Sequence, residues 1–141
     1  MSWLLDTNVV SELRKARAGS AVDAAFKEWA ESRPVGLDFL SAITIYELEL
    51  GIGQVMRRDH HQAQALQQWL ETQVLADFSG RILDLTRTVL SRAASLQVHR
   101  TRQERDTFIA ATALTHNLGI VTRNVRDFDG TGVHLLNPWQ L

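Results

Sequence analysis

Short apolar runs alternate with longer segments of helical periodicity along the chain, and this alternation constrains the fold more than any other feature of the sequence. Strands are expected at the apolar runs, which are residues 3–5, 35–40, 81–85, 119–122 and 132–135. Helices are expected between them, at residues 9–15, between Ser20 and Pro34, and at residues 44–56, 59–76, 86–98 and 102–116. Short strands that alternate with helices predict an α/β fold in which helices cover both faces of a mostly parallel sheet.

Length and composition predict a single domain over residues 1–141. The chain is 45% hydrophobic and 22% charged, and it contains no repeat, linker or biased segment. It has no cysteine, which excludes disulfides and thiolate metal ligands. No apolar stretch is long enough to cross a bilayer, and the first residues lack the basic and apolar regions of a signal peptide. We therefore expect a cytoplasmic protein with no membrane partner.

Several polar residues mark the expected ends of helices. Pairs with the spacing of a capping box occur at Ser20 and Asp23, Thr44 and Glu47, and Thr101 and Glu104. In such a box the first side chain bonds to the backbone three residues on, and the second side chain bonds back. Asn117 or Gly119 is expected to end the helix at residues 102–116.

Three acidic residues that lie far apart in the chain, Asp6, Glu47 and Asp106, are the main candidates for a functional site. Each has an ordinary structural interpretation when taken singly: a helix cap, the return residue of a capping box, and a carboxylate in the first turn of a helix. Asp6 and Asn124, however, both follow expected strands. Polar groups beyond the carboxyl ends of parallel strands line the usual binding crevice of such a sheet.

The neighbours of these three acids suggest a metal site. Each acid stands beside apolar or small residues that are expected to pack in the core, where carboxylates are costly unless a cation accompanies them. Several carboxylates without a histidine or cysteine suit Mg²⁺ or Mn²⁺, which prefer oxygen ligands. Such metals activate water and neutralise the charge of a phosphodiester.

The net charge of −1 gives no independent support for a nucleic-acid partner, because proteins that hold many phosphates usually carry a basic surplus. The basic residues instead form local groups, at residues 14–17, 57–58, 100–105 and 123–126. Two interpretations remain open: a solvated surface of balanced charge, or an acidic metal centre rimmed by arginines. Arg14, Arg123 and Arg126 are the candidates for holding phosphates.

Four segments of the chain also carry a family resemblance. Residues 4–13, 40–51, 106–113 and 121–128 resemble, in order, the four signature motifs of PIN-domain toxins of the VapC type. The tail Asn137-Pro138-Trp139 is similar to that of the FitB-like branch of this family. The likeness spans nearly the whole chain, and its specificity comes from the four motifs together.

The resemblance implies a three-layer α/β/α sandwich with a short, mostly parallel central sheet, in which Asp6, Glu47 and Asp106 hold a metal. It further implies a Mg²⁺- or Mn²⁺-dependent endoribonuclease, acting on RNA as the toxin of a type II toxin–antitoxin pair. The implied partners are a VapB-like antitoxin and a second copy of the chain in a homodimer. The alternatives are a PIN scaffold that binds RNA or protein without cleaving it, and a DNA nuclease of the same fold class.

The last motif departs from the family at Asn124, where an acid is common. The nearest carboxylate is Asp127, so either Asn124 or Asp127 is expected to complete the metal and catalytic site. Thr122 and Asn8 are expected to orient the carboxylates by hydrogen bonding.

Overall fold

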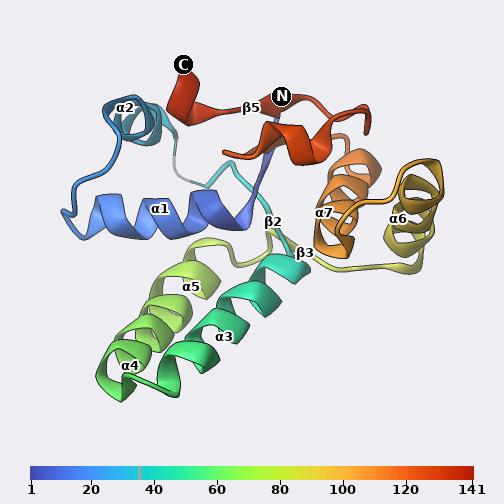
Figure 1. The fold of residues 1–141 in the computed structure, drawn as a ribbon. Helices are drawn as coiled ribbons and strands as arrows, with labels where there is room; N and C mark the ends of the chain where they lie inside the picture. The colour runs from blue at the N-terminus through green and yellow to red at the C-terminus, as the bar shows by residue number, and fades with distance from the viewer. Residues whose placement is uncertain (35) are drawn as a thin grey trace.

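The chain folds around short parallel strands (Figure 1). A computed structural model describes residues 1–34 and 36–141. Its strands are β1 (Trp3–Leu5), β2 (Leu40–Ser41), β3 (Ile82–Leu83), β4 (Gly119–Val121) and β5 (Leu135–Leu136). One ladder has the order β1-β4-β5 and the other pairs β2 with β3. A parallel bridge between Leu4 and Phe39 joins the two ladders, so the full order is β3-β2-β1-β4-β5.

Helices fill the connections between the strands, as the alternation of the sequence predicts. The first half of the chain contains α1 (Thr7–Arg17), α2 (Ala24–Ser32) and α3 (Ala42–Met56). They are followed by α4 (His60–Trp69), the π-helical turn η1 (Leu70–Val74), α5 (Leu75–Asp77), α6 (Arg87–His99) and α7 (Glu104–Thr115). Two 3₁₀ turns, η2 (Val125–Phe128) and η3 (Pro138–Gln140), lie near the C-terminus. None of the helices described in residues 1–34 and 36–141 is both long and apolar enough to cross a membrane.

The side-chain alternation of the strands separates the helices into two layers. Leu5 and Val121 face one core, which includes side chains of α1, α2, α3 and α4. Leu4 and Ile120 face the opposite core, which is covered by α7. Successive residues of a strand point to opposite faces, so two adjacent leucines of β1 supply both cores. Helix α6 packs against α7 on its outer side, and Figure 1 shows this pair opposite the α3–α4 hairpin. The predicted three-layer α/β/α architecture is confirmed.

The strand expected at residues 35–40 begins later than predicted. The structure places β2 at residues 40–41, preceded by the bridging residue Phe39, and Val35 lies outside the described residues. Similarly, the strand expected at residues 132–135 is found at Leu135–Leu136. The single helix expected at residues 59–76 is one continuous helical segment, with a π-helical turn at residues 70–74.

The three predicted capping boxes are wrong. Asp23 itself caps α2, and its carboxylate accepts the backbone N–H groups of Ala25 and Phe26. Ser41, rather than Thr44, caps α3. Helix α7 begins after Gln103 without a side-chain cap. Ser, Thr and Asp all serve as N-caps, so where several occur close together the packing of the segment decides which one begins the helix.

The end of α7 agrees with the sequence. Asn117 adopts a positive φ of 55°, the left-handed conformation that stops a helix. Gly119 then enters β4 directly beside the ring of Trp3. A Cβ atom at position 119 would lie 2.6 Å from Cε3 of Trp3, so this strand start requires glycine.

Candidate metal centre

Asp6 lies at the junction of β1 and α1 and is fully buried. Its Oδ1 accepts the backbone N–H of Thr7 at 2.8 Å, so Asp6 does cap α1. Its Oδ2 also accepts the hydroxyl of Thr122 at 2.7 Å and the side-chain amide of Asn8 at 3.2 Å. Thr122 and Asn8 therefore hold the carboxylate in place, as the sequence predicts. The helix-cap interpretation and the functional interpretation of Asp6 are compatible.

Glu47 lies in the second turn of α3 and does not return to a cap. Its Oε1 accepts the hydroxyl of Thr7 at 2.6 Å, and that hydroxyl lies 3.1 Å from the hydroxyl of Thr44. Burial raises the pKa of Glu47, and the nearby charge of Asp6 raises it further, whereas Thr7 and Arg105 lower it. Since Thr7 directly follows Asp6, a single residue of α1 fixes the position of Glu47 relative to Asp6.

Asp106 is the third residue of α7 and is 5% exposed. Burial raises the pKa of Asp106 to about 6, against the lowering effect of Arg105. The negative charges of Asp127, Asp6 and Glu47 also raise this pKa, which places all four carboxylates within electrostatic reach of one another. The Oδ1 atom of Asp106 is buried and accepts no hydrogen bond in the described structure, although Nη1 of Arg105 lies 3.4 Å from it as an ion-pair partner. A buried acceptor without a donor is uncommon in folded proteins.

Arg105 is the residue that joins the three acids. Its Nε lies 2.8 Å from Oε2 of Glu47, and its Nη1 lies 3.3 Å from Oδ1 of Asp6 and 3.4 Å from Oδ1 of Asp106. We refer to Asp6, Glu47 and Asp106 as the acid cluster. Residues 6, 47 and 106 thus converge in space, with one guanidinium among them. In the described part of the chain, no three acidic or histidine side chains are already arranged around a common point as a bound metal would require.

Arg105 was not singled out from the sequence, where it looks like one member of a basic group at residues 100–105. One local signal distinguishes it. A cation in the first turn of a helix is opposed by the helix dipole, so a nearby acid must compensate it. That acid could not be identified from the sequence, because Asp6 precedes Arg105 by 99 residues.

Asn124 immediately precedes η2 and Asp127 lies within it, close to the acid cluster. The backbone N–H of Asn124 donates to the hydroxyl of Thr122, which in turn donates to Asp6. Asp127 acts on the cluster through its charge, which raises the pKa of Asp106. Both residues line an open hollow of about 510 Å³ that includes Arg123 and Arg126. The electrostatic link to Asp106 favours Asp127 as the fourth acid, and the choice between Asn124 and Asp127 stays a prediction.

The nominated arginines divide into two groups. Arg123 and Arg126 line the hollow next to Asn124, and the guanidinium of Arg123 lies over the ring of Trp139 at 5.2 Å. Arg14 lies in the last turn of α1, whose first turn is next to the cluster, and its guanidinium lies over Trp69 at 5.8 Å. Arg14 follows Asp6 by eight positions, which corresponds to about 12 Å along the helix axis. The structure therefore does not place Arg14 at the acid cluster.

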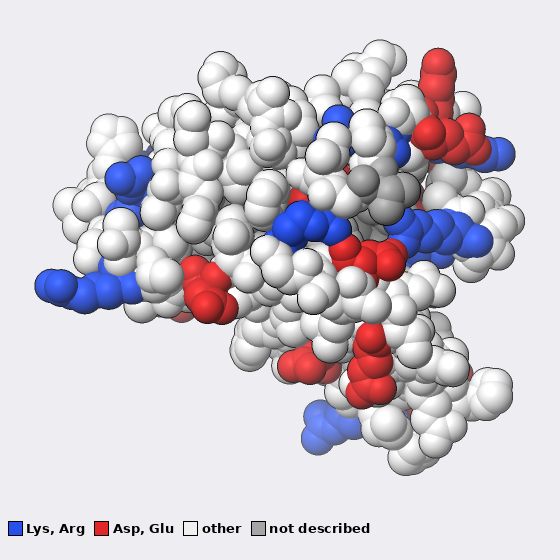
Figure 2. All heavy atoms as spheres, turned by 180° about the vertical axis from the view of Figure 1, so that it is seen from behind, with Lys and Arg blue, Asp and Glu red and all other residues white. Residues whose placement is uncertain are grey.

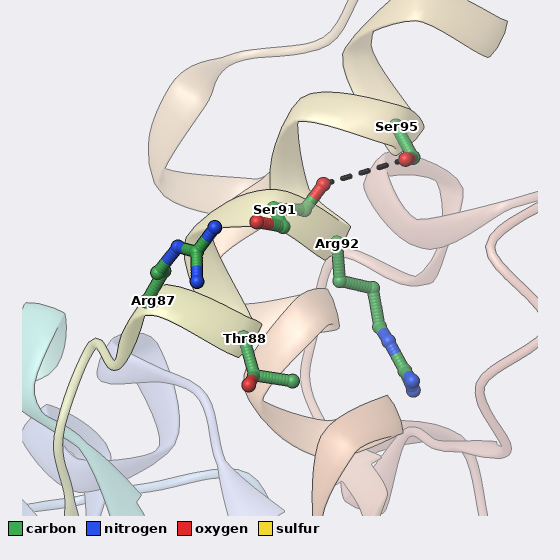
Figure 3. A pocket seen from close by; sticks show the side chains of 5 residues that line it. All are labelled: Arg87, Thr88, Ser91, Arg92 and Ser95. Atoms are coloured by element: carbon green, nitrogen blue, oxygen red, sulfur yellow. Dashed lines mark hydrogen bonds between the residues drawn. The ribbon is translucent and has the colours of Figure 1, made fainter.

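The surface carries charges of both signs. Figure 2 shows acidic and basic side chains interleaved on one face of the molecule, without a large patch of a single sign. A shallow hollow on α6 is lined by residues of that one helix: Arg87, Thr88, Ser91, Arg92 and Ser95. Figure 3 shows the hydroxyl of Ser95 bonded to the carbonyl of Ser91, which satisfies it within the helix. This hollow is a groove along a helix surface, whereas the acid cluster lies where β1, α1, α3 and α7 meet.

Comparison with known proteins gives the family. A sequence model of the PIN domain matches residues 3–132. The chain belongs to the PIN-domain family. PIN-domain relatives include VapC ribonuclease Y4jK of Sinorhizobium fredii, 33% identical over 97% of each chain. Toxin FitB of Neisseria gonorrhoeae is also 33% identical, over 96% of this chain and 97% of its own.

Similar solved structures agree with this assignment. The FitAcB complex from Neisseria gonorrhoeae contains a chain that is 33% identical and superimposes with a TM-score of 0.85, covering 99% of both chains. A toxin–antitoxin complex from Klebsiella pneumoniae matches at 26% identity and a TM-score of 0.69, over 97% of this chain and 98% of the other. The predicted resemblance to VapC-type toxins and to FitB is confirmed.

Proposed function

We propose that this PIN-domain protein is the toxin of a type II toxin–antitoxin pair and a Mg²⁺- or Mn²⁺-dependent endoribonuclease. The observation that carries the proposal is the convergence of Asp6, Glu47 and Asp106 from α1, α3 and α7 into one partly buried cluster. Relatives named as a VapC ribonuclease and as a FitB toxin support the class of reaction.

The donor chemistry of the cluster supports a hard divalent cation, although its side chains must still close around a common point. Its donors are carboxylate oxygens, and Oδ1 of Asp106 is a buried acceptor that lacks a hydrogen-bond donor. Asp6, Glu47 and Asp106 would hold the metal, with Asp127 or Asn124 completing the site. A metal bound there would supply the positive charge that offsets the phosphodiester and activates water for its hydrolysis.

The chain's own residues supply position and charge around the cluster. Thr122 and Asn8 hold the carboxylate of Asp6, and Thr7 holds that of Glu47, so both acids keep fixed orientations. Arg123 and Arg126 line the adjoining hollow, where their side chains can hold phosphates that flank the scissile bond.

Cleavage of RNA by substituted proteins tests the proposed activity. Asp6→Asn and Asp106→Asn are expected to lose Mg²⁺-dependent RNA cleavage and growth inhibition, with circular dichroism spectra like that of the wild type. Asp84→Asn, which alters an exposed acid after β3, is the matched control and should cleave normally. If both cluster variants cleave RNA as fast as the wild type, the proposed site is wrong.

If the wild type binds RNA without cleaving it in Mg²⁺ or Mn²⁺, the protein is a binding module. Cleavage of DNA alone would indicate a DNA nuclease.

We further propose a VapB-like antitoxin and a homodimer as the partners of the chain, in the cytoplasm. The similar solved structures include the FitAcB complex, FitAB bound to a DNA fragment and a toxin–antitoxin complex from Klebsiella pneumoniae. Co-expression with the product of an adjacent antitoxin-like reading frame should yield a complex of fixed stoichiometry that no longer cleaves RNA. Light scattering on the purified toxin would give twice the mass of the chain. A complex that still cleaves at the full rate would refute the antitoxin assignment, and a monomer would refute the dimer.

A further inference from the structure

Arg105 makes contacts that an ordinary surface arginine does not make. One guanidinium reaches all members of the acid cluster, at 2.8 Å from Glu47, 3.3 Å from Asp6 and 3.4 Å from Asp106. The side chain of Arg105 is 29% exposed, whereas that of Asp6 is fully buried. Among the residues that the structure describes, Arg105 is the one cation in ion-pair contact with these acids. Its charge therefore sits where the cluster needs a counter-ion.

The position of Arg105 in its helix indicates that this contact is not a by-product of helix formation. Arg105 is the second residue of α7, where the helix dipole disfavours a positive charge. The three carboxylates outweigh this local cost. Because a guanidinium is planar and carries several donors, it can contact several carboxylates at once.

A guanidinium and a divalent metal compete for the same oxygens of this cluster. Mg²⁺ holds its oxygen ligands at about 2.0–2.1 Å in near-ideal octahedral geometry. Oε2 of Glu47 and Oδ1 of both Asp6 and Asp106 are in contact with Arg105, so these oxygens are not free to bind a metal while Arg105 holds them. Their charges differ as well. Three ionised carboxylates carry a charge of −3, so one guanidinium leaves a net charge of −2, whereas a divalent cation in its place leaves −1. Arginine remains charged at any physiological pH, so the competition is between two cations rather than between protonation states.

We propose that Arg105 is an internal competitor for the metal, which occupies the acid cluster in the metal-free protein and must swing out before a metal is held. This inference rests on the metal site of the proposed function and adds a conformational step to it. The side chain of Arg105 is 29% exposed, so it already borders the solvent into which it would rotate. The apparent metal affinity then equals the intrinsic affinity multiplied by the fraction of metal-free molecules in which Arg105 has left the cluster.

The test is the affinity of Mn²⁺ for variants of Arg105, measured by isothermal titration calorimetry without RNA. If Arg105 occupies the cluster in about 90–99% of metal-free molecules, Arg105→Gln should bind Mn²⁺ about 10- to 100-fold more tightly than the wild type. Arg92→Gln on α6 removes the same charge from an exposed arginine, and it should bind within about twofold of the wild type. Arg105→Lys keeps the charge on a point-like ammonium, so its affinity for Mn²⁺ should lie between those of the wild type and Arg105→Gln. Arg105→Lys also provides the test if Arg105→Gln does not fold.

A second readout follows the side chain itself. The Nε–H resonance of Arg105 in a ¹⁵N-labelled sample should be protected from exchange in the metal-free protein, because this group contacts Glu47. Saturating Mg²⁺ should move it to the shift and exchange rate of a solvated arginine. A resonance that does not change at saturating Mg²⁺ would overturn the proposal.

The outcomes separate this inference from the proposed function. Mn²⁺ affinity that is equal or weaker in both Arg105 variants, while Asp106→Asn still abolishes binding, would refute the competition and leave the metal site standing. If neither the wild type nor Arg105→Gln binds Mn²⁺ in a way that depends on Asp106, the metal site is refuted. The proposed competition between Arg105 and the metal is then refuted as well. If Arg105→Gln and Arg92→Gln gain the same affinity for Mn²⁺, the gain comes from the lower net charge of the protein. That result would also refute the inference.

Discussion

Asp106→Asn is expected to stabilise the metal-free protein at neutral and alkaline pH, although it removes a residue of the proposed site. In the folded state burial raises the pKa of Asp106 from its ordinary value of 3.8 to about 6. A carboxyl with a raised pKa favours the folded state when it is protonated. That contribution is complete below about pH 4 and is lost as the pH rises through about 6. Asparagine has a similar shape and carries no charge at any pH.

The size of the effect follows from the pKa values. Each pKa unit corresponds to about 1.4 kcal/mol, so a rise from 3.8 to about 6 corresponds to about 3 kcal/mol of unfolding free energy. Asp106 is 5% exposed, so screening by solvent does not reduce this figure greatly. Asp106→Asn should therefore be more stable than the wild type by about 2–3 kcal/mol at pH 8, and the difference should shrink to near zero at pH 4.

Urea unfolding in the presence of EDTA measures this difference at pH 8, 6 and 4. Asp84→Asn is the control and should match the wild type at each pH, because Asp84 is exposed. Saturating Mn²⁺ should reverse the order at pH 8, since a ligand that binds only the folded wild type stabilises it. A stability difference that does not depend on pH, or a loss of stability at pH 8, would refute the reasoning.

Two glycines give further predictions that do not depend on function. Gly119→Ala should destabilise the fold by about 1–3 kcal/mol, because its Cβ would lie 2.6 Å from the ring of Trp3, and urea unfolding measures the loss. Gly53→Ala on α3 is the comparison variant, because a Cβ atom there meets nothing within 4 Å. Alanine favours a helix over glycine, so this substitution should stabilise the protein by about 0.5–1 kcal/mol. Equal effects at the two positions would show that helix and strand propensity, rather than contact with Trp3, decides the outcome.

The sequence was sufficient where the signal is local. The run Trp3-Leu4-Leu5 predicts β1, and the alternation of its side chains supplies both cores. Asn117 predicts the end of α7 through its tolerance of positive φ. The order of strands and helices predicts a parallel sheet between two layers of helices, because parallel strands need crossover connections.

Tertiary structure decided what local chemistry leaves open. Ser41 and Thr44 are comparable caps, and the start of α3 at Ala42 frees Thr44 to lie beside Thr7. Glu47 consequently points to the acid cluster rather than to its own backbone.

The acid cluster itself shows the same division. That Asp6, Glu47 and Asp106 are candidates can be inferred from the chain, because each acid is flanked by residues that must be buried. That Arg105 lies among them could not be inferred. Its charge is disfavoured at the start of α7, and the acids that compensate it are brought there by long-range packing of the sheet and helices. Propensity acts over a few residues, whereas the electrostatic balance of a buried cluster depends on every segment that meets there.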